Sequence, residues 1–117
     1  MGEFQEIPTV KFEDWEKLDL RIGTIKAVKV HPNADELYVL LIDLGPGEND
    51  RQIVAGLRKY YSEDELLGKK VVFINNLEHK EIRGVRSQGM ILAADDGVNP
   101  IALLTVDREV NNNAKVK

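Results

Sequence analysis

The sequence predicts an all-β domain: a barrel of five strands with one short helix between the third and fourth strands and another near the N-terminus. Two features lead to this prediction. The apolar stretches are short and are separated by clusters of Gly, Pro, Asn and Asp, a pattern typical of strands joined by turns. The 117 residues also suffice for one core and one domain.

The N-terminal part predicts a tail followed by a short helix. Residues 1–10 show no periodicity, so we expect a flexible tail ahead of a domain that comprises residues 11–117 and includes a C-terminal extension. Phe12, Trp15 and Leu18 recur at spacing three, which predicts a helix. Its aromatic face is expected to pack against the barrel or a partner.

The first strand is expected over residues 19–31, which is long for one strand. The parity of its apolar residues changes between Ile22 and Ile25. We therefore expect a β-bulge near Gly23–Thr24, which would coil the strand as a small closed barrel requires.

The second and third strands are expected to form a hairpin. Residues 31–36 contain Pro, Asn and Asp and predict a turn. Residues 37–44 are almost continuously apolar, which predicts a strand covered on both faces, by its own fold or by another subunit. A turn at residues 45–50 then leads into a strand at residues 51–55.

A second helix is expected over Ser62–Leu67. The segment begins with the Ser-x-x-Glu spacing of a capping box, and Gly68 follows it where a C-cap glycine belongs. This helix separates the third strand from the fourth.

The fourth and fifth strands, at residues 71–74 and 90–94, hold a loop between them. Gly84 and Gly89 lie in the second half of this loop, where they permit a positive-φ turn and a close approach of the backbone to a ligand. Residues 101–104 are a candidate sixth strand.

This order of elements matches the OB-fold, a Greek-key barrel of five strands that commonly has a helix between the third and fourth. OB-folds bind ligands across strands 2 and 3 and with the loops joining strands 1 to 2 and 4 to 5. In this chain those loops are residues 31–36 and 77–87. We expect Asn111–Asn113 to interrupt any further regular element.

The second of these loops concentrates positive charge in an acidic chain. The net charge of −4 argues against nonspecific coating of nucleic acid by the whole surface. Lys80, Arg83 and Arg86 nevertheless face only Glu81 as an opposing charge between residues 79 and 87. Such a loop suits contact with phosphates better than catalysis.

Several classes of site are missing from the sequence. The chain has no cysteine, which excludes disulfides and thiolate zinc sites, and its two histidines lack the spacing of a metal motif. It contains no phosphate loop, dinucleotide fingerprint or nucleophile elbow. We therefore expect no cofactor, no metal and no catalysis by this chain alone.

No apolar run spans a membrane and no signal peptide is visible, so we expect a cytoplasmic protein without membrane contact.

Four spaced motifs resemble the tRNA-binding domain of methionyl-tRNA synthetase. They are Asp19–Gly23, His31–Asp35, Ala55–Leu57 and the segment from Asn76 to Met90. The same module is similar to a free-standing bacterial tRNA-binding protein and to the endothelial-monocyte-activating-polypeptide-like domain of the eukaryotic synthetase complex. The resemblance implies an OB-fold that binds tRNA by shape and backbone, usually as a homodimer, and that is appended to a catalytic subunit or forms a separate β subunit.

For some of the candidate tRNA-binding residues, RNA contact is the expected role, whereas for others a structural role or simple surface exposure is an equally good explanation. Phosphate contact is the role expected for the three cations of the loop. Arg58 and Lys59 are candidates that ordinary surface exposure would explain equally well. Asn33 and Ser87 could contact RNA or satisfy nearby backbone groups in turns. The full set is Lys80, Arg83, Arg86, Ser87, Asn33, Arg58 and Lys59.

Three residues depart from the pattern of the family and weaken the positive surface. The family usually has a basic residue where this chain has Glu36, Pro where it has His79, and frequently a basic residue where it has Glu81. A second interpretation is therefore a protein-binding module, either a chaperone related to protein export or an assembly domain. In that case the apolar strand at residues 37–44 and the Trp15 helix would serve dimerisation and docking.

Overall fold

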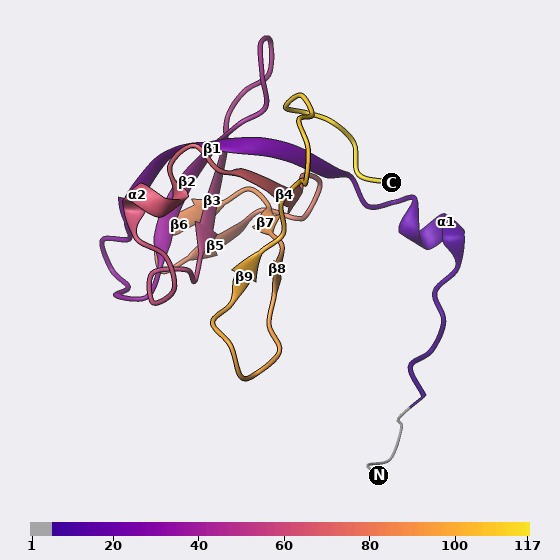
Figure 1. Cartoon of the computed structure of the whole chain (residues 1–117), viewed down its shortest axis with the longest axis horizontal. Coiled ribbons are helices and arrows are strands. Elements are labelled where there is room, and N and C mark those ends of the chain that lie inside the picture. The colour runs from indigo at the N-terminus through magenta and orange to yellow at the C-terminus, as the bar shows by residue number, and fades with distance from the viewer. Residues whose placement is uncertain (1–5) are drawn as a thin grey trace.

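The computed structural model describes residues 6–117, and its centre is an antiparallel sheet of five strands curled into a nearly closed barrel (Figure 1). The strand order is β3-β2-β1-β4-β7. These strands are β1 (Leu20–Val30), β2 (Tyr38–Asp43), β3 (Arg51–Ala55), β4 (Lys70–Ile74) and β7 (Met90–Ile91). The predicted five-stranded OB-like barrel is confirmed.

The long strand β1 is shared between two partners. Its first half, Leu20–Thr24, pairs with β4, and its second half pairs with β2. A Cβ atom on Gly23 would lie 2.4 Å from Cγ2 of Ile42, so only glycine fits where β1 passes from one partner to the other. The predicted bulge exists but lies between Ile25 and Ala27. The register with β4 is unbroken from Leu20 to Thr24, and the parity of the buried residues changes after Ile22 because residues on both faces of the strand are buried there.

The apolar strand β2 is fully covered on only one of its faces. Tyr38, Leu40 and Ile42 are buried in the core, whereas Val39 and Leu41 on the other face are half-buried. The single chain therefore covers one face fully and the other in part, and coverage of the second face by another subunit stays a prediction. An unbroken apolar run does not distinguish a fully covered face from a partly covered one.

Two short helices flank the barrel. The helix α1 spans Phe12–Trp15 and α2 spans Glu63–Leu66, so each is shorter than predicted. The predicted capping box of α2 is present, because the Ser62 hydroxyl accepts a hydrogen bond from the backbone N–H of Glu65 while the Glu65 carboxylate accepts one from the backbone N–H of Ser62. Hydrogen bonds from the backbone N–H and the side chain of Ser62 to the carboxylate lower the pKa of Glu65. Leu66 is fully buried and joins the core.

The predicted loop at residues 77–87 is a hairpin of two short strands, β5 (Lys80–Ile82) and β6 (Val85–Ser87). Its two-residue turn has Arg83 at φ 53° and Gly84 at φ 89°. Turns with two positive φ angles match the twist of paired strands, which explains why this segment is ordered as a hairpin.

The predicted fifth strand is broken into two pieces. Residue Leu92 separates β7 from β8 (Ala93–Ala94), which pairs with β9 (Ala102–Leu103) instead of continuing the main sheet. The candidate sixth strand at residues 101–104 is therefore confirmed as a two-residue strand.

The C-terminal segment lies against β1 through an isolated bridge between Arg21 and Lys115, so no further strand follows Asn111–Asn113 in the described part of the chain, as expected. The backbone N–H of Asn113 donates to the carbonyl of Ile22, and the N–H of Val116 donates to the carbonyl of Leu20. The segment fits there because β2 leaves this edge of β1 at Thr24, so the backbone groups of the first half need another partner.

The predicted N-terminal tail lies partly outside the described residues. Residues 6–10, which are described, are exposed and belong to no helix or strand. None of the helices within residues 6–117 is long and apolar enough to cross a membrane.

Candidate functional site

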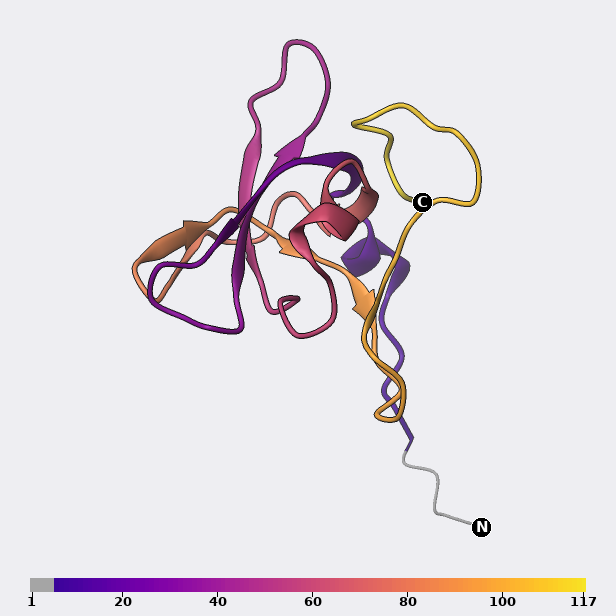
Figure 2. The ribbon, with the colours of Figure 1, turned by 60° about the vertical axis from the view of Figure 1, so that its left-hand side comes forward.

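Three segments that are distant in the sequence meet at one end of the barrel. They are the loop after β1 (residues 31–36, the 31–36 loop), the β5–β6 hairpin and the turn after β3 (residues 58–60, the 58–60 turn). Figure 2 shows the 31–36 loop and the β5–β6 hairpin side by side, away from the β8–β9 hairpin. All seven predicted site residues belong to these segments.

A buried histidine joins the 31–36 loop to the hairpin. Nδ1 of His31 accepts a hydrogen bond from the backbone N–H of Asn33 at 2.9 Å, and Nε2 lies 2.9 Å from the carbonyl oxygen of Ile82. Since a carbonyl only accepts and an amide N–H only donates, these two contacts fit the tautomer with its proton on Nε2. His31 is 3% exposed, so both bonds are shielded from water.

Asn33 and Arg83 complete this connection at the tip of the hairpin. Nδ2 of Asn33 donates to the carbonyl of Arg83 at 3.2 Å, and Nη2 of Arg83 donates to the carbonyl of Asn33 at 3.1 Å. The two side chains thus hold each other's backbone. Asn33 and Arg83 are brought together as the prediction requires, although the Asn33 amide is already engaged within the chain.

The 58–60 turn holds the other side of the 31–36 loop. Nη1 of Arg58 donates to the carbonyl of Asp35 at 2.9 Å, and Nζ of Lys59 lies 2.7 Å from Oε1 of Glu36. The hydrogen bond and negative charge of Glu36 raise the pKa of Lys59. Glu36, the residue that departs from the family pattern, therefore neutralises one of the predicted RNA-binding cations.

The cations of the β5–β6 hairpin lie on two different faces. The cross-strand pairs are Lys80 with Ser87, Glu81 with Arg86, and Ile82 with Val85. Because side chains alternate along a strand, Lys80 shares its face with the buried Ser87, whereas Arg86 and Glu81 share the outer face. Arg83 projects from the turn between them.

The three cations of the hairpin are not neutralised by an ion pair, and Arg58, whose Nη1 donates to a backbone carbonyl, likewise forms no ion pair with another described residue. Lys80, Arg83 and Arg86 are exposed, and none forms an ion pair with another residue between positions 6 and 117. Glu81 lies opposite Arg86, yet no salt bridge joins them among the described residues. The end of the barrel therefore presents three positive groups on a rigid hairpin, an arrangement suited to a polyanion.

Ser87 closes the barrel and does not face solvent. Its hydroxyl accepts a hydrogen bond from the backbone N–H of Val54 at 3.0 Å and donates one to the carbonyl of Gly89 at 3.1 Å. Gln88 serves the same edge of β3, because its side chain accepts from the N–H of Gln52 and its backbone N–H donates to the Gln52 carbonyl. The position of Ser87 favours a structural role over RNA contact.

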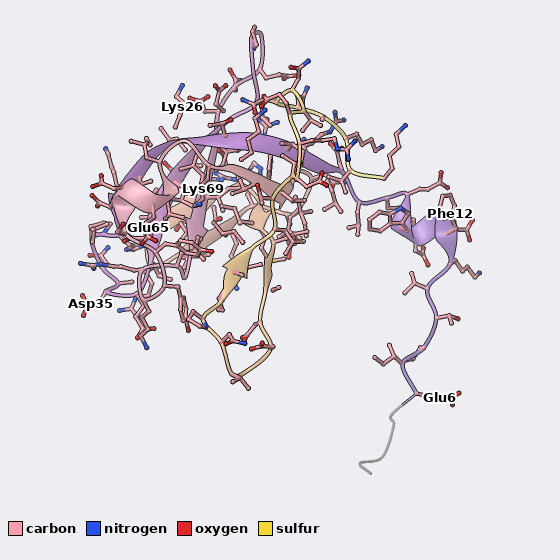
Figure 3. The ribbon with its side chains drawn as sticks, in the orientation of Figure 1. Glu6, Phe12, Lys26, Asp35, Glu65 and Lys69 are labelled. Carbon is pink, nitrogen blue, oxygen red and sulfur yellow. The ribbon has the colours of Figure 1, made fainter. Side chains whose placement is uncertain are left out.

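A second surface lies at the opposite end of the molecule. Figure 3 shows Phe12 on α1, far from Asp35 in the 31–36 loop. Phe12 is 72% exposed and lines an open hollow of about 290 Å³ with Trp15, Leu18 and Val116. The aromatic face of α1 thus contacts the C-terminal segment only in part and remains largely uncovered in the single chain.

Sequence reasoning missed the contacts made by His31 and Gln88. The sequence marks His31 as part of a turn and of one family motif, but not as a contact to the hairpin. Within residues 6–117 no group of three His, Asp or Glu side chains is placed to hold a metal ion. The position of His31 in a Pro-containing turn was visible, but its partner Ile82 is 51 residues away in the chain. Local patterns do not reveal such long-range pairs.

Comparisons with known proteins agree on one family. A family model described as "Putative tRNA binding domain" matches residues 20–115. The methionine–tRNA ligase of Pyrococcus horikoshii is 57% identical over 115 residues, which are 98% of this chain and 16% of the ligase. The chain therefore spans about one sixth of the curated relatives it matches.

Solved structures share the fold over nearly the whole chain. The MetRS related protein from Pyrococcus horikoshii superposes with a TM-score of 0.86 at 30% identity, covering 95% of this chain and 100% of that one. The CsaA chaperone protein from Picrophilus torridus has a TM-score of 0.85 at 29% identity, covering 93% and 100%. One architecture therefore occurs in a synthetase-related protein and in a chaperone.

Proposed function

This chain belongs to the tRNA-binding domain family, and from that premise we propose that it is the appended or separate-subunit tRNA-binding domain of a methionyl-tRNA synthetase. In this role it acts in the cytoplasm and increases the tRNA affinity of a catalytic core that is not part of this chain. The observation that carries the proposal is the β5–β6 hairpin, which presents Lys80, Arg83 and Arg86 without ion pairs among the described residues and is held in place by His31.

The arrangement supports recognition of the RNA backbone. The guanidinium groups of Arg83 and Arg86 can each bind a phosphate through two N–H donors, and the ammonium of Lys80 acts as a point charge. Phosphate contacts position a protein on nucleic acid but carry no sequence information. We therefore expect this surface to favour tRNA by its shape and to discriminate little among tRNA sequences.

Arg58, Lys59 and Asn33 have secondary roles in this proposal. Their polar groups are engaged by Asp35, Glu36 and Arg83, so their main contribution is to hold the loops in register. Arg58 adds positive charge at the border of the surface, whereas the charge of Lys59 is cancelled by Glu36. Ser87 acts indirectly, through the closure of the barrel.

The same proposal includes a homodimer. The hollow lined by Phe12, Trp15, Leu18 and Val116 exposes apolar side chains that a second copy would cover. Because this surface lies at the other end of the molecule from the 31–36 loop (Figure 3), a dimer formed there would leave both tRNA-binding ends accessible. Sedimentation of wild type and of Trp15→Ala tests this part.

The test of tRNA binding is fluorescence anisotropy with labelled tRNA at several salt concentrations, with an unstructured RNA of similar length as the control. Three phosphate contacts predict that log K falls with log[salt] with a slope of about −2 to −3. Arg83→Ala and Lys80→Ala should each reduce this slope by about 0.7 to 0.9. Lys26→Ala is the matched control, because Lys26 is already paired with Asp50 at 2.8 Å.

A second candidate function is peptide binding, which the likeness to the CsaA chaperone protein favours. A peptide-binding module would depend on the half-buried face of β2 and on α1 and would show little dependence on salt. Absence of tRNA binding at low salt, combined with binding of apolar peptides, would replace the proposed function with this one.

A further inference from the structure

A hollow of about 350 Å³ lies beneath the β5–β6 hairpin, between β3 and the start of β7. We refer to it as the hairpin hollow. Its apolar wall is formed by Val54, Leu77, Ile82 and Met90, and its polar rim by Glu78 and Lys80. The proposed recognition of the RNA backbone does not involve these apolar residues.

The lining of the hairpin hollow is unusual for a surface that attracts anions. Leu77 is 38% exposed and Met90 is 46% exposed, although both lie beside the unneutralised charge of Lys80. The volume is at the lower end of the roughly 300–1,000 Å³ range of small-molecule sites. That size fits a single heterocycle and is too small for a helix.

The alternation of the hairpin explains why Lys80 belongs to the hollow. Lys80 and Ile82 are on the inner face of β5, together with Val85 and Ser87 of β6. A ligand in the hollow would therefore touch the apolar Ile82 and the Lys80 ammonium at once. Arg86, on the outer face, remains available for a different phosphate.

The polar rim offers one acceptor that could read a base. The hydroxyl of Ser87 is already committed to Val54 and Gly89. The Glu78 carboxylate is exposed and forms no hydrogen bond or ion pair within residues 6–117. Carboxylates accept hydrogen bonds from the exocyclic amino group of cytosine. A base that carries an amino group therefore fits this rim better than uracil.

We propose that the hairpin hollow takes one unstacked, amino-bearing nucleobase of the bound tRNA while Lys80 binds the adjoining phosphate. This inference rests on the proposed function and adds a base-binding subsite to it. The combination of apolar walls, a cationic rim and a nearby carboxylate matches the apolar faces, phosphate and amino edge of a nucleotide. RNA-binding proteins commonly take up bases that leave the stack.

The test compares a blunt RNA duplex with the same duplex carrying one bulged nucleotide, and uses methyl NMR signals of Met90 and Leu77. Both RNAs offer the same type of phosphate contact, so their salt slopes should be similar. The bulged RNA should bind about 3- to 10-fold more tightly and shift both methyl signals by ring currents. Bulged C should bind better than bulged U, and Glu78→Gln should reduce that preference.

Substitutions separate the hollow from the charged surface. Leu77→Ala should weaken the bulged RNA about 3- to 10-fold and leave the duplex and the salt slope unchanged, because no charge is removed. Leu67→Ala is the matched control, since Leu67 is 56% exposed and lies after α2, outside the hollow. Met90→Ala, at the other side of the hollow, provides a second variant should Leu77→Ala fail to fold.

The outcomes distinguish this inference from the proposed function. If tRNA binds with the expected salt slope but the bulge gives no advantage and the methyl signals stay unchanged, the base subsite is refuted and the proposed function stands. If no RNA binds at low salt, both fail. An apolar peptide that shifts the same methyl signals while RNA does not would assign the hollow to a protein partner.

Discussion

Nε2 of His31 lies 2.9 Å from the carbonyl oxygen of Ile82, so a single buried imidazole joins the loop after β1 to the hairpin that carries the unpaired cations. The opposite ring nitrogen accepts from the N–H of Asn33. Two loops that are far apart in the chain thereby become one rigid surface. The contacts of His31 therefore set the shape of the candidate tRNA-binding surface, and the arginine and lysine side chains set its charge.

His31→Phe should therefore weaken both folding and tRNA binding. The variant leaves the backbone N–H of Asn33 and the carbonyl of Ile82 without partners, which costs roughly 1–3 kcal/mol. Affinity for tRNA should fall about 3- to 10-fold with an unchanged salt slope, because no charge is lost. Urea unfolding and anisotropy measure the two effects. The exposed His79 supplies the control, and a His79→Phe variant that behaves like His31→Phe would contradict this explanation.

A substitution of Ser87 likewise distinguishes a structural role from an RNA-binding role, because the two roles predict different effects on stability and on the salt slope of tRNA binding. Ser87→Ala removes the acceptor for the buried N–H of Val54 and should reduce the free energy of unfolding by about 1–3 kcal/mol. If the role of Ser87 is structural, the salt slope of tRNA binding stays the same as in wild type. A slope reduced without loss of stability would show direct contact with phosphate.

The sequence was informative where local chemistry decides the structure. The capping box at Ser62 and the glycine at Gly68 identified α2, and the turn residues separated the strands of the barrel correctly. Pairing of the β5–β6 hairpin was missed because Arg83 adopts a positive φ, which the residue type does not favour. The bulge in β1 was misplaced because both faces of the strand are buried around Ile22 and Gly23, so the apolar parity changes there without an inserted residue.

Loop position and composition predict that Lys80, Arg83 and Arg86 lie exposed on one segment, and the structure has them exposed on the β5–β6 hairpin. Their role in tRNA binding stays a prediction, and the contacts around them were not predicted. The contacts of His31, the pairing of Lys59 with Glu36 and the burial of Ser87 all depend on residues distant in the sequence. Such contacts follow from the closure of the barrel, which a single sequence does not specify residue by residue.

Asp19 should make the stability of the domain depend on acidic pH. Burial opposes ionisation of its carboxyl group, but hydrogen bonds from Asn75 and Arg21 and the charge of Arg21 outweigh this effect and lower the pKa of Asp19 below 3.8. A carboxyl group with a lowered pKa stabilises the folded state above its unfolded-state pKa. This contribution is lost as the pH falls through the folded-state pKa.

Asp19→Asn tests this linkage. At pH 6 the variant should be less stable than wild type by about 1 kcal/mol, because the ion pair with Arg21 is lost. The difference should shrink as the pH falls through the lowered pKa of Asp19, where the wild-type carboxyl group becomes protonated. Urea unfolding at pH 6 and pH 2.5 measures both values, with Glu16→Gln on the exposed turn after α1 as the control. A difference that is the same at both pH values would exclude Asp19 as the titrating group.

Glu36 should limit the affinity of this domain for tRNA, because its carboxylate is 2.7 Å from the ammonium of Lys59 and cancels a charge at the border of the surface. Glu36→Gln removes the opposing charge and makes Lys59 available to a phosphate. The pair is exposed on both sides, so stability should change by less than about 1 kcal/mol. The salt slope should become steeper by up to about 0.9, and affinity at low salt should rise.

The matched control for this prediction is Glu13→Gln, which removes an equal charge near Lys11 on the opposite end of the molecule. General reduction of the negative net charge would strengthen binding equally in the two variants. A steeper slope in Glu36→Gln alone would place Lys59 within reach of the RNA. Equal slopes in wild type and Glu36→Gln would restrict the contact surface to the β5–β6 hairpin, because a cation that gains no phosphate when its partner is removed lies outside the footprint of the RNA.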